Sequence, residues 1–177
     1  SAPLIQPLAD EIARYITAAG LNRPPVIGHS MGGTLALKLG LSGRVGRVMV
    51  VDMLPAGAAM VGGTASGLGF LADQLSSYLT GTAAGRRYLA QIVAQTPGAK
   101  TSDPDVIANA LRDLANVDLG PQLSRLTVPL HVVFAVGSDA QQAAAITRRF
   151  REAYAGAKGA VLKPEAVLEK RYYLLNK

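Results

Sequence analysis

The sequence contains no cysteine, which excludes a disulfide framework and thiolate metal sites. A cysteine-free chain folds in either redox environment, so this absence does not identify a cellular compartment. Only two histidines are present, His29 and His131, and they are not paired at helical or turn spacing. The stretch Gly62–Thr64 lacks the lysine and helix-start pattern of a phosphate-binding loop. We therefore expect no metal and no cofactor.

Long runs of large apolar side chains are also lacking. Residues 53–72 carry no charge over 20 positions, which makes them the only candidate membrane span by length. Five glycines interrupt this stretch, and we interpret it as a mobile lid or loop rather than a membrane span. The chain begins Ser1-Ala2-Pro3, without a charged region leading into an apolar core, so we expect any signal peptide to be absent or already removed.

Acidic residues are fewer than basic ones, 12 against 18, which gives a formal net charge of +6. From Arg148 onward there are eight basic and three acidic residues, so most of the excess lies at the carboxyl end. This end lacks the glycine and aromatic spacing of an RNA-binding motif. We interpret the charge as a solvated helix face and tail, and expect no nucleic-acid partner.

The remaining composition and patterning indicate an α/β domain. A length of 177 residues with 49% hydrophobic side chains predicts one domain with a substantial core. Apolar residues at helical spacing predict an amphipathic helix over residues 4–19. A continuous apolar run predicts that residues 47–51 form a parallel strand buried on both faces. Further patterns predict strands at 130–136 and 160–162, and helices at 34–39, 68–79, 83–95, 104–115 and 140–154.

Residues 28–32 read Gly-His-Ser-Met-Gly and match the G-x-S-x-G nucleophile elbow. A short apolar segment, Val26-Ile27, precedes the motif and a helical pattern follows it, which is the strand, elbow and helix order that the motif requires. In this turn, Ser30 is predicted to be a nucleophile, with the flanking glycines giving it room. The backbone N–H of Met31, at the helix amino end, is predicted to bind an oxyanion.

The chain resembles a known family at these residues. Residues 28–33 and Arg44 to Asp52 look like the elbow and the next strand of α/β-hydrolase-fold enzymes of the esterase, lipase and haloperoxidase-like kind. Leu126 to Asp139 is similar to the family's penultimate strand and acid-bearing turn. The resemblance covers about residues 1–163. It implies a partial α/β-hydrolase fold, with a mostly parallel sheet flanked by helices, a helical cap at about 53–118 and an unplaced tail at 164–177.

A serine nucleophile needs a histidine base and an acid that orients this base. In the family the chain order is serine, acid, histidine, which implies Asp139 as the acid, with Asp52 as a second candidate because some members carry the acid there. No histidine follows Asp139. We expect His29 to point away from Ser30. We expect His131, inside a strand, to face a helical layer below the catalytic end.

The chain departs from the family pattern at both ends. Residues 163–170 take the place of the family's histidine loop, and the early strands of the fold would precede residue 1. We therefore expect the elbow strand to present an unpaired edge and the protein to form a homo-oligomer. Two functions stay open. One is a carboxylic-ester hydrolase with a small-molecule substrate, of which an acyltransferase or haloperoxidase-like enzyme is a variant. The other is a catalytically impaired remnant or interaction module that lacks the triad histidine.

Overall fold

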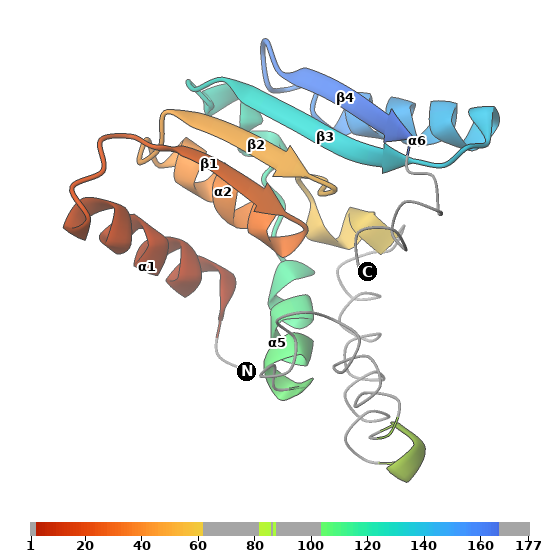
Figure 1. Ribbon diagram of the computed structural model, residues 1–177, viewed down its shortest axis with the longest axis horizontal. Coiled ribbons are helices and arrows are strands. Elements are labelled where there is room, and N and C mark those ends of the chain that lie inside the picture. Colours follow the sequence, from red (N-terminus) through yellow and green to blue (C-terminus); the bar gives the residue numbers. More distant parts are fainter. Residues whose placement is uncertain (1–2, 62–81, 86, 88–103, 167–177) are drawn as a thin grey trace, which may run out of the picture. The chain divides into compact units, whose positions relative to one another are not determined.

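The computed structural model describes residues 3–61, 82–85, 87 and 104–166 (Figure 1). Within these ranges it contains helices, short 3-10 helices and strands. In chain order these are α1 (Ile5–Ala18), β1 (Pro25–His29), α2 (Met31–Leu41), β2 (Arg47–Val51), η1 (Gly57–Val61), α5 (Pro104–Leu114), η3 (Gly120–Arg125), β3 (Leu130–Val136), α6 (Ala140–Ala153) and β4 (Val161–Ala166).

Most elements predicted from the sequence are confirmed. The helices expected at 4–19, 104–115 and 140–154 correspond to α1, α5 and α6, and the strands expected at 47–51 and 130–136 have the predicted bounds. The helix after the elbow is longer than predicted, since α2 begins directly after Ser30. The helix predicted at 68–79 and most of the one predicted at 83–95 lie outside the described residues. None of the described helices is long and apolar enough to cross a membrane.

The chain divides into two compact units, one of residues 1–7 and 57–117 and the other of residues 8–56 and 118–177. In the first unit, a carboxylate oxygen of Asp113 on α5 accepts hydrogen bonds from the backbone N–H groups of Leu4 (2.7 Å) and Ile5 (2.6 Å). These N–H groups belong to the amino end of α1, where no helical carbonyl is available to them. Asp113 therefore caps α1 from a residue more than 100 positions away in the chain.

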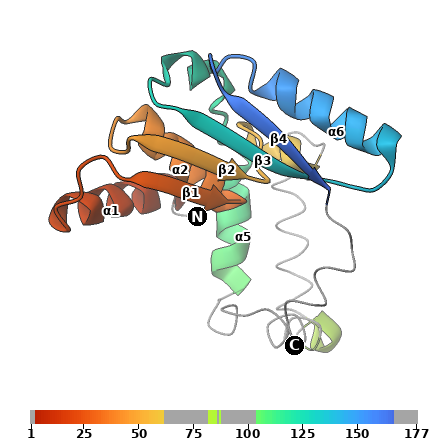
Figure 2. The same ribbon diagram turned by 45° about the horizontal axis from the view of Figure 1, so that its top comes forward.

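The second unit is built on a four-stranded sheet in the order β1-β2-β3-β4 (Figure 2). All neighbouring strands are parallel. The strands follow one another in space in the same order as in the sequence. Helix α2 connects β1 to β2, and helix α6 connects β3 to β4. This arrangement confirms the expected partial α/β-hydrolase fold, in which every described strand presents its carboxyl end at the same edge of the sheet.

Helices α2 and α6 cover one face of this sheet. A Cβ atom at Gly33 of α2 would stand 2.9 Å from a methyl group of Val50, so the helix backbone lies directly on β2. On α6, Phe150 stacks on Phe134 of β3 with ring centroids 4.2 Å apart. The register of the strands places Val50 and Phe134 on the same face. This covered face holds the core of the unit, since its side chains from β2 and β3 are buried.

The opposite face, which we call the open face, carries no described helix of this unit, and in Figure 1 its strands lie in front of α2 and α6. Its side chains from β2 and β3 are half-buried or exposed, and those from β1 and β4 are exposed. The expectation that residues 47–51 are buried on both faces is therefore wrong. The open face consists of Pro25, Ile27, His29, Arg47, Met49, Val51, His131, Val133, Ala135, Val161, Lys163 and Glu165.

A buried tyrosine ties the segment after β2 to the end of α6. The Tyr154 hydroxyl donates a 2.6 Å hydrogen bond to the backbone carbonyl of Met53, and both residues are 1% exposed. Burial raises the pKa of the Tyr154 hydroxyl, so the group stays a protonated donor across the physiological range. The hydroxyl thus satisfies a carbonyl that the strand ladder does not reach.

Replacing Tyr154 by Phe is expected to lower the free energy of unfolding by about 1–3 kcal/mol, because the Met53 carbonyl would stay buried without a donor. Thermal unfolding should show this as a decrease in melting temperature of about 2–4 °C per kcal/mol. Tyr15→Phe is the matched control, since Tyr15 is 68% exposed. Equal melting temperatures for the two variants would contradict this role of the Tyr154 hydroxyl.

Candidate functional site

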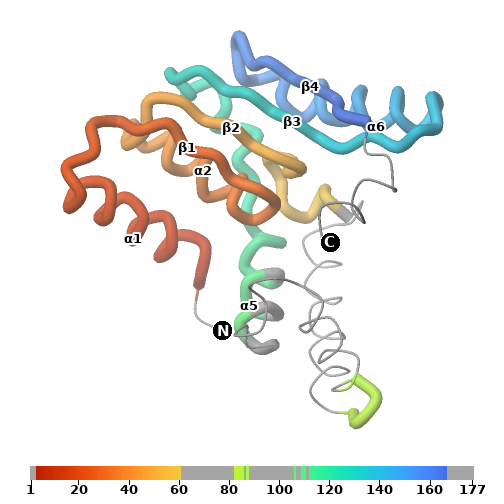
Figure 3. Tube along the Cα trace, in the orientation of Figure 1, coloured from red at the N-terminus to blue at the C-terminus, as the bar shows by residue number. Residues whose placement is uncertain are grey.

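Ser30 occupies the corner between β1 and α2, where the chain turns sharply from strand to helix (Figure 3). Its backbone has φ 53° and ψ −125°, a conformation that residues other than glycine rarely adopt. Such strain persists only when the surrounding structure enforces it, and it occurs mainly at functional sites. Ser30 is also exposed. The backbone thus presents this serine outward at the carboxyl edge of the sheet.

Two backbone hydrogen bonds hold the corner. The Ser30 N–H donates to the Val51 carbonyl on β2 (2.9 Å), and the Ser30 carbonyl accepts from the Gly33 N–H (2.8 Å). A Cβ atom at position 28 would overlap the backbone of Gly32 and stand 2.7 Å from the Gly33 nitrogen. Gly28 is therefore required by close backbone contact, as the motif predicts. At Gly32, by contrast, a Cβ atom would meet no described atom within 4 Å, so the expected crowding is found at Gly28 only.

Met31 is the first residue of α2. The first four N–H groups of a helix have no carbonyl partner within it, and the aligned peptide dipoles give this end a partial positive charge. The Met31 N–H follows Ser30 directly along the chain. Its role as the oxyanion donor stays a prediction from the motif.

Asp52, the second candidate for the acid, ends β2 beside Ser30. The register pairs His29 with Val51, so the next residues along the two strands, Ser30 and Asp52, are neighbours. Asp52 also has a positive φ, 52°, and its Oδ1 accepts a 2.6 Å hydrogen bond from the Ala135 N–H of β3. β2 ends at Val51, and beyond it the Asp52 carboxylate accepts the hydrogen bond that a backbone carbonyl of a longer β2 would accept from β3. This contact directs the Asp52 carboxylate to β3, on the side away from β1.

Asp139 lies three residues beyond β3, at the same edge of the sheet as Ser30. It is the N-cap of α6, and its Oδ1 accepts a 2.7 Å hydrogen bond from the Gln142 N–H. The side chain is exposed. Because β2 lies between β1 and β3, the strands that carry Ser30 and Asp139 are about 10 Å apart. The structure therefore places Ser30 and Asp139 at the same edge of the sheet, on strands that are not neighbours.

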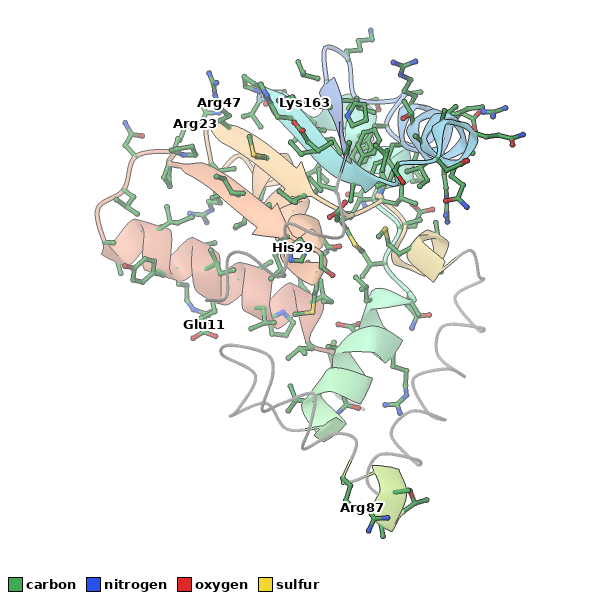
Figure 4. All side chains as sticks on the ribbon, turned by 45° about the vertical axis from the view of Figure 1, so that its right-hand side comes forward. Glu11, Arg23, His29, Arg47, Arg87 and Lys163 are labelled. Atoms are coloured by element: carbon green, nitrogen blue, oxygen red, sulfur yellow. The ribbon has the colours of Figure 1, made fainter. Side chains whose placement is uncertain are left out.

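Both histidines lie on the open face. His29 is the last residue of β1, at the arrowhead in Figure 4, and alternation along the strand sets its side chain beside Ile27 and away from the α2 side. His131 pairs with Met49, so it lies three residues below the level of Ser30 and two strands away. These offsets are each roughly 10 Å, which is beyond hydrogen-bond reach. The expectation that His131 faces a helical layer is wrong, because α2 and α6 pack on the other face.

Two features of the site were not predicted. One is the hydrogen bond of Asp52, for which the available signal is a carboxylate directly after a predicted strand. The other is Thr34, one helical turn after Ser30 on α2, which is 1% exposed and whose Oγ1 has no hydrogen-bond partner among the described residues. A single hydroxyl among the otherwise apolar residues 31–37 is the signal for it in the sequence.

Comparison with known proteins agrees with this geometry. The model of the alpha/beta hydrolase family matches residues 3–170, and the chain belongs to this family. Among solved structures, a hydrolase from Pseudomonas aeruginosa is 18% identical, with a TM-score of 0.66, over 99% of this chain and 69% of that one. An enol-lactonase from Burkholderia xenovorans LB400 is 18% identical, with a TM-score of 0.57, over 97% of this chain and 69% of that one.

A deformylase from Pseudomonas putida S16 is 19% identical, with a TM-score of 0.57, over 90% of this chain and 64% of its own length. The chain thus spans about two thirds of these structures, and at such identities the likeness shows the shared fold. Among curated proteins, none matches the chain. Membership of the family supports a hydrolase as the general class of function.

Proposed function

We propose that this protein is a serine hydrolase that acts on carboxylic esters, with Ser30 as its nucleophile. The observation that carries the proposal is the backbone of Ser30, which holds a positive φ at a strand-to-helix corner. A serine in ordinary strand or helix geometry would need no such strain. The strain presents the hydroxyl at the carboxyl edge of a parallel sheet, where α/β proteins bind their ligands.

In the proposed reaction, the Ser30 hydroxyl attacks the ester carbonyl and the Met31 N–H binds the oxyanion that forms. Asp139 orients the histidine that takes the serine proton. The gap of about 10 Å between the strands of Ser30 and Asp139 leaves room for an imidazole to bridge the two side chains. Neither His29 nor His131 occupies this gap and the sequence has no third histidine, so in this proposal another subunit supplies the base. We propose the segment 53–118 as the cap that selects the substrate.

The name of one structural neighbour supports ester chemistry, because it is an enol-lactonase and a lactone is a cyclic ester. Another is a deformylase, which extends the comparison to the removal of a formyl group. Both favour attack on a carbonyl carbon of a small molecule.

A second candidate function is favoured by the position of the histidines. If no base reaches Ser30, the chain is a catalytically impaired hydrolase-fold remnant that serves as an interaction module. Its elbow would then be retained for folding, since Gly28, Ser30 and Gly33 also fix how α2 lies on the sheet.

Treating the chain with a fluorophosphonate probe separates the two functions. The serine oxygen of an activated hydrolase displaces fluoride from phosphorus, and the proton passes to the base. We expect a single adduct, located by mass spectrometry on the peptide that contains Ser30. Absence of an adduct, or adducts spread over several exposed serines, would favour the interaction module.

A further inference from the structure

We propose that the amino edge of the sheet in the second unit binds a membrane surface that contains anionic lipids. Because β1 to β4 are parallel, the segments that lead into the four strands lie together at this edge. These segments are residues 19–25, 42–47, 125–130 and 154–161, and all of them belong to the second unit. They contain no acidic residue. Their basic residues, which we call the basic edge, are Arg23, Arg44, Arg47, Arg125 and Lys158.

Contacts between neighbouring segments hold the basic edge together. The Gly46 N–H donates a 3.2 Å hydrogen bond to the Pro24 carbonyl, which joins the segment before β1 to the segment before β2. Figure 4 shows Arg23 and Arg47 beside each other, at the end of the sheet opposite to His29. The first two strands therefore present their arginines as one group.

The segments before β3 and β4 are joined in a similar way. A Cβ atom at Gly156 would stand 3.5 Å from the Cβ atom of Leu123, so the segment before β4 packs on η3. Arg125 is the last residue of η3, and Lys158 follows Gly156 by two positions. Four strands about 4.8 Å apart span about 15 Å, roughly twice the distance over which physiological salt screens a charge. The charges of neighbouring segments therefore act together on an anion.

The basic residues at this edge are exposed and have no acidic partner. Arg125 donates a 2.8 Å hydrogen bond to the neutral amide of Gln122, and the other four form no ion pair with any described residue. Stabilisation of helix carboxyl ends does not account for them, because that interaction is confined to the last helical turn. Arg23 follows the end of α1 by five residues, and Arg44 follows the end of α2 by three. The charge of the basic edge is thus available to an external anion.

The carboxyl edge of the same sheet has the opposite charge. Residues 30, 52–56 and 137–139, which follow β1, β2 and β3, include Asp52 and Asp139 and no basic residue. An anionic surface attracts the amino edge and repels the carboxyl edge, so it orients the unit as well as binding it. In this orientation the carboxyl edge, with Ser30, points away from the membrane.

Two features favour a lipid surface over a nucleic acid. Leu21, two residues before Arg23, is 46% exposed although it is large and apolar. Sites that bind membrane surfaces combine basic side chains with apolar side chains that enter the boundary between headgroups and acyl chains. Proteins that bind single-stranded nucleic acids stack the bases on exposed aromatic rings. The only aromatic residue of the four segments, Tyr154, is 1% exposed.

Co-sedimentation of the full chain with lipid vesicles tests the proposal. Compared with vesicles of phosphatidylcholine alone, we expect at least about tenfold tighter binding when about 30% of the lipid is phosphatidylglycerol. Raising the salt from about 0.05 to 0.5 M should release the protein. Arg23→Gln and Arg47→Gln should each weaken binding about fivefold, the contribution of one basic residue at an anionic membrane surface. Leu21→Ser should weaken it about threefold or more, because it removes the apolar contact.

Arg87→Gln is the matched control, since it removes the same charge from an exposed arginine of the first unit. Its binding to the anionic vesicles should stay within about twofold of the unchanged chain. Thermal unfolding of each variant verifies that the fold is retained. An equal loss in Arg87→Gln and Arg47→Gln would overturn the proposal, because net charge alone would then account for binding.

A single-stranded oligonucleotide in place of the vesicles tests the alternative polyanion. Binding of the oligonucleotide that Arg23→Gln and Arg47→Gln weaken, without binding to anionic vesicles, would overturn the proposal in favour of a nucleic acid. Absence of binding to either probe at low salt would also overturn it, and the basic edge would then be a solvated surface.

Discussion

Ser30→Ala is expected to abolish ester turnover by this protein, with a loss in kcat of about 10⁴–10⁶-fold if a base serves the serine. The size of this effect follows from how nucleophile, base and acid act together. Removal of the nucleophile or of the base alone costs nearly as much as removal of all three members. The turnover of an activated ester, such as a nitrophenyl acetate, measures it. Ser42→Ala is the control, since Ser42 lies at the other end of α2 and bonds to the Leu39 carbonyl.

The magnitude of this loss also reports on the base. Without a base within reach, Ser30 would already be a poor nucleophile, and its removal would cost less than about tenfold. A loss of that size would contradict the proposed hydrolase and support the interaction module. The yield of the fluorophosphonate adduct does not report on the whole reaction, because the probe reacts with the serine only once. Turnover also requires hydrolysis of the acyl-enzyme, so kcat reports on both steps.

The elbow is the part of the site that the sequence predicts best. Its geometry is local, because a glycine at position 28 and a serine at position 30 constrain a single turn between a strand and a helix. The structure agrees in the positive φ of Ser30 and in the close contact at Gly28. Helix and strand positions were also predictable, since apolar spacing along the chain determines them without knowledge of what they contact.

Burial of the sheet was not predictable in the same way. The sequence Val-Met-Val-Val at residues 48–51 has apolar side chains on both faces and is the same whether or not a layer covers each face. Whether Met49 and Val51 are buried depends on elements that are distant in the sequence. This explains why the strand was located correctly while its burial on both faces, and the orientation of His131, were predicted wrongly.

The two aspartates illustrate a different limit. A carboxylate just after a strand can serve as a catalytic acid, as an N-cap or as a substitute for a ladder carbonyl, and all three uses need the same residue at the same position. In the structure Asp139 caps α6 and Asp52 bonds to Ala135. A capping carboxylate has a second oxygen, so the role of Asp139 as the acid stays a prediction from the family pattern.

Gly28→Ala adds one methyl group beside the site, and we expect it to destabilise the fold more than a methyl group added at any other glycine near Ser30. The new Cβ atom would overlap the backbone of Gly32, and no flexible side chain could move to relieve this contact. The start of α2 must therefore shift, which also displaces Ser30 and Met31. We expect a decrease in the free energy of unfolding of about 3 kcal/mol or more, and a melting temperature lower by about 6–12 °C.

The neighbouring Gly32→Ala substitution provides the matched control for this effect. It adds the same methyl group within four residues, but its Cβ atom would meet no described atom within 4 Å, and the residue lies in a helix, where alanine is favoured over glycine by about 0.5–1 kcal/mol. The melting temperature should therefore stay equal or rise slightly. Fluorophosphonate labelling of Ser30 should fall about 100-fold in Gly28→Ala, because displacement of a nucleophile by 1 Å is enough for such a loss. If both variants melted alike, contact with the Gly32 backbone could not be what fixes the elbow.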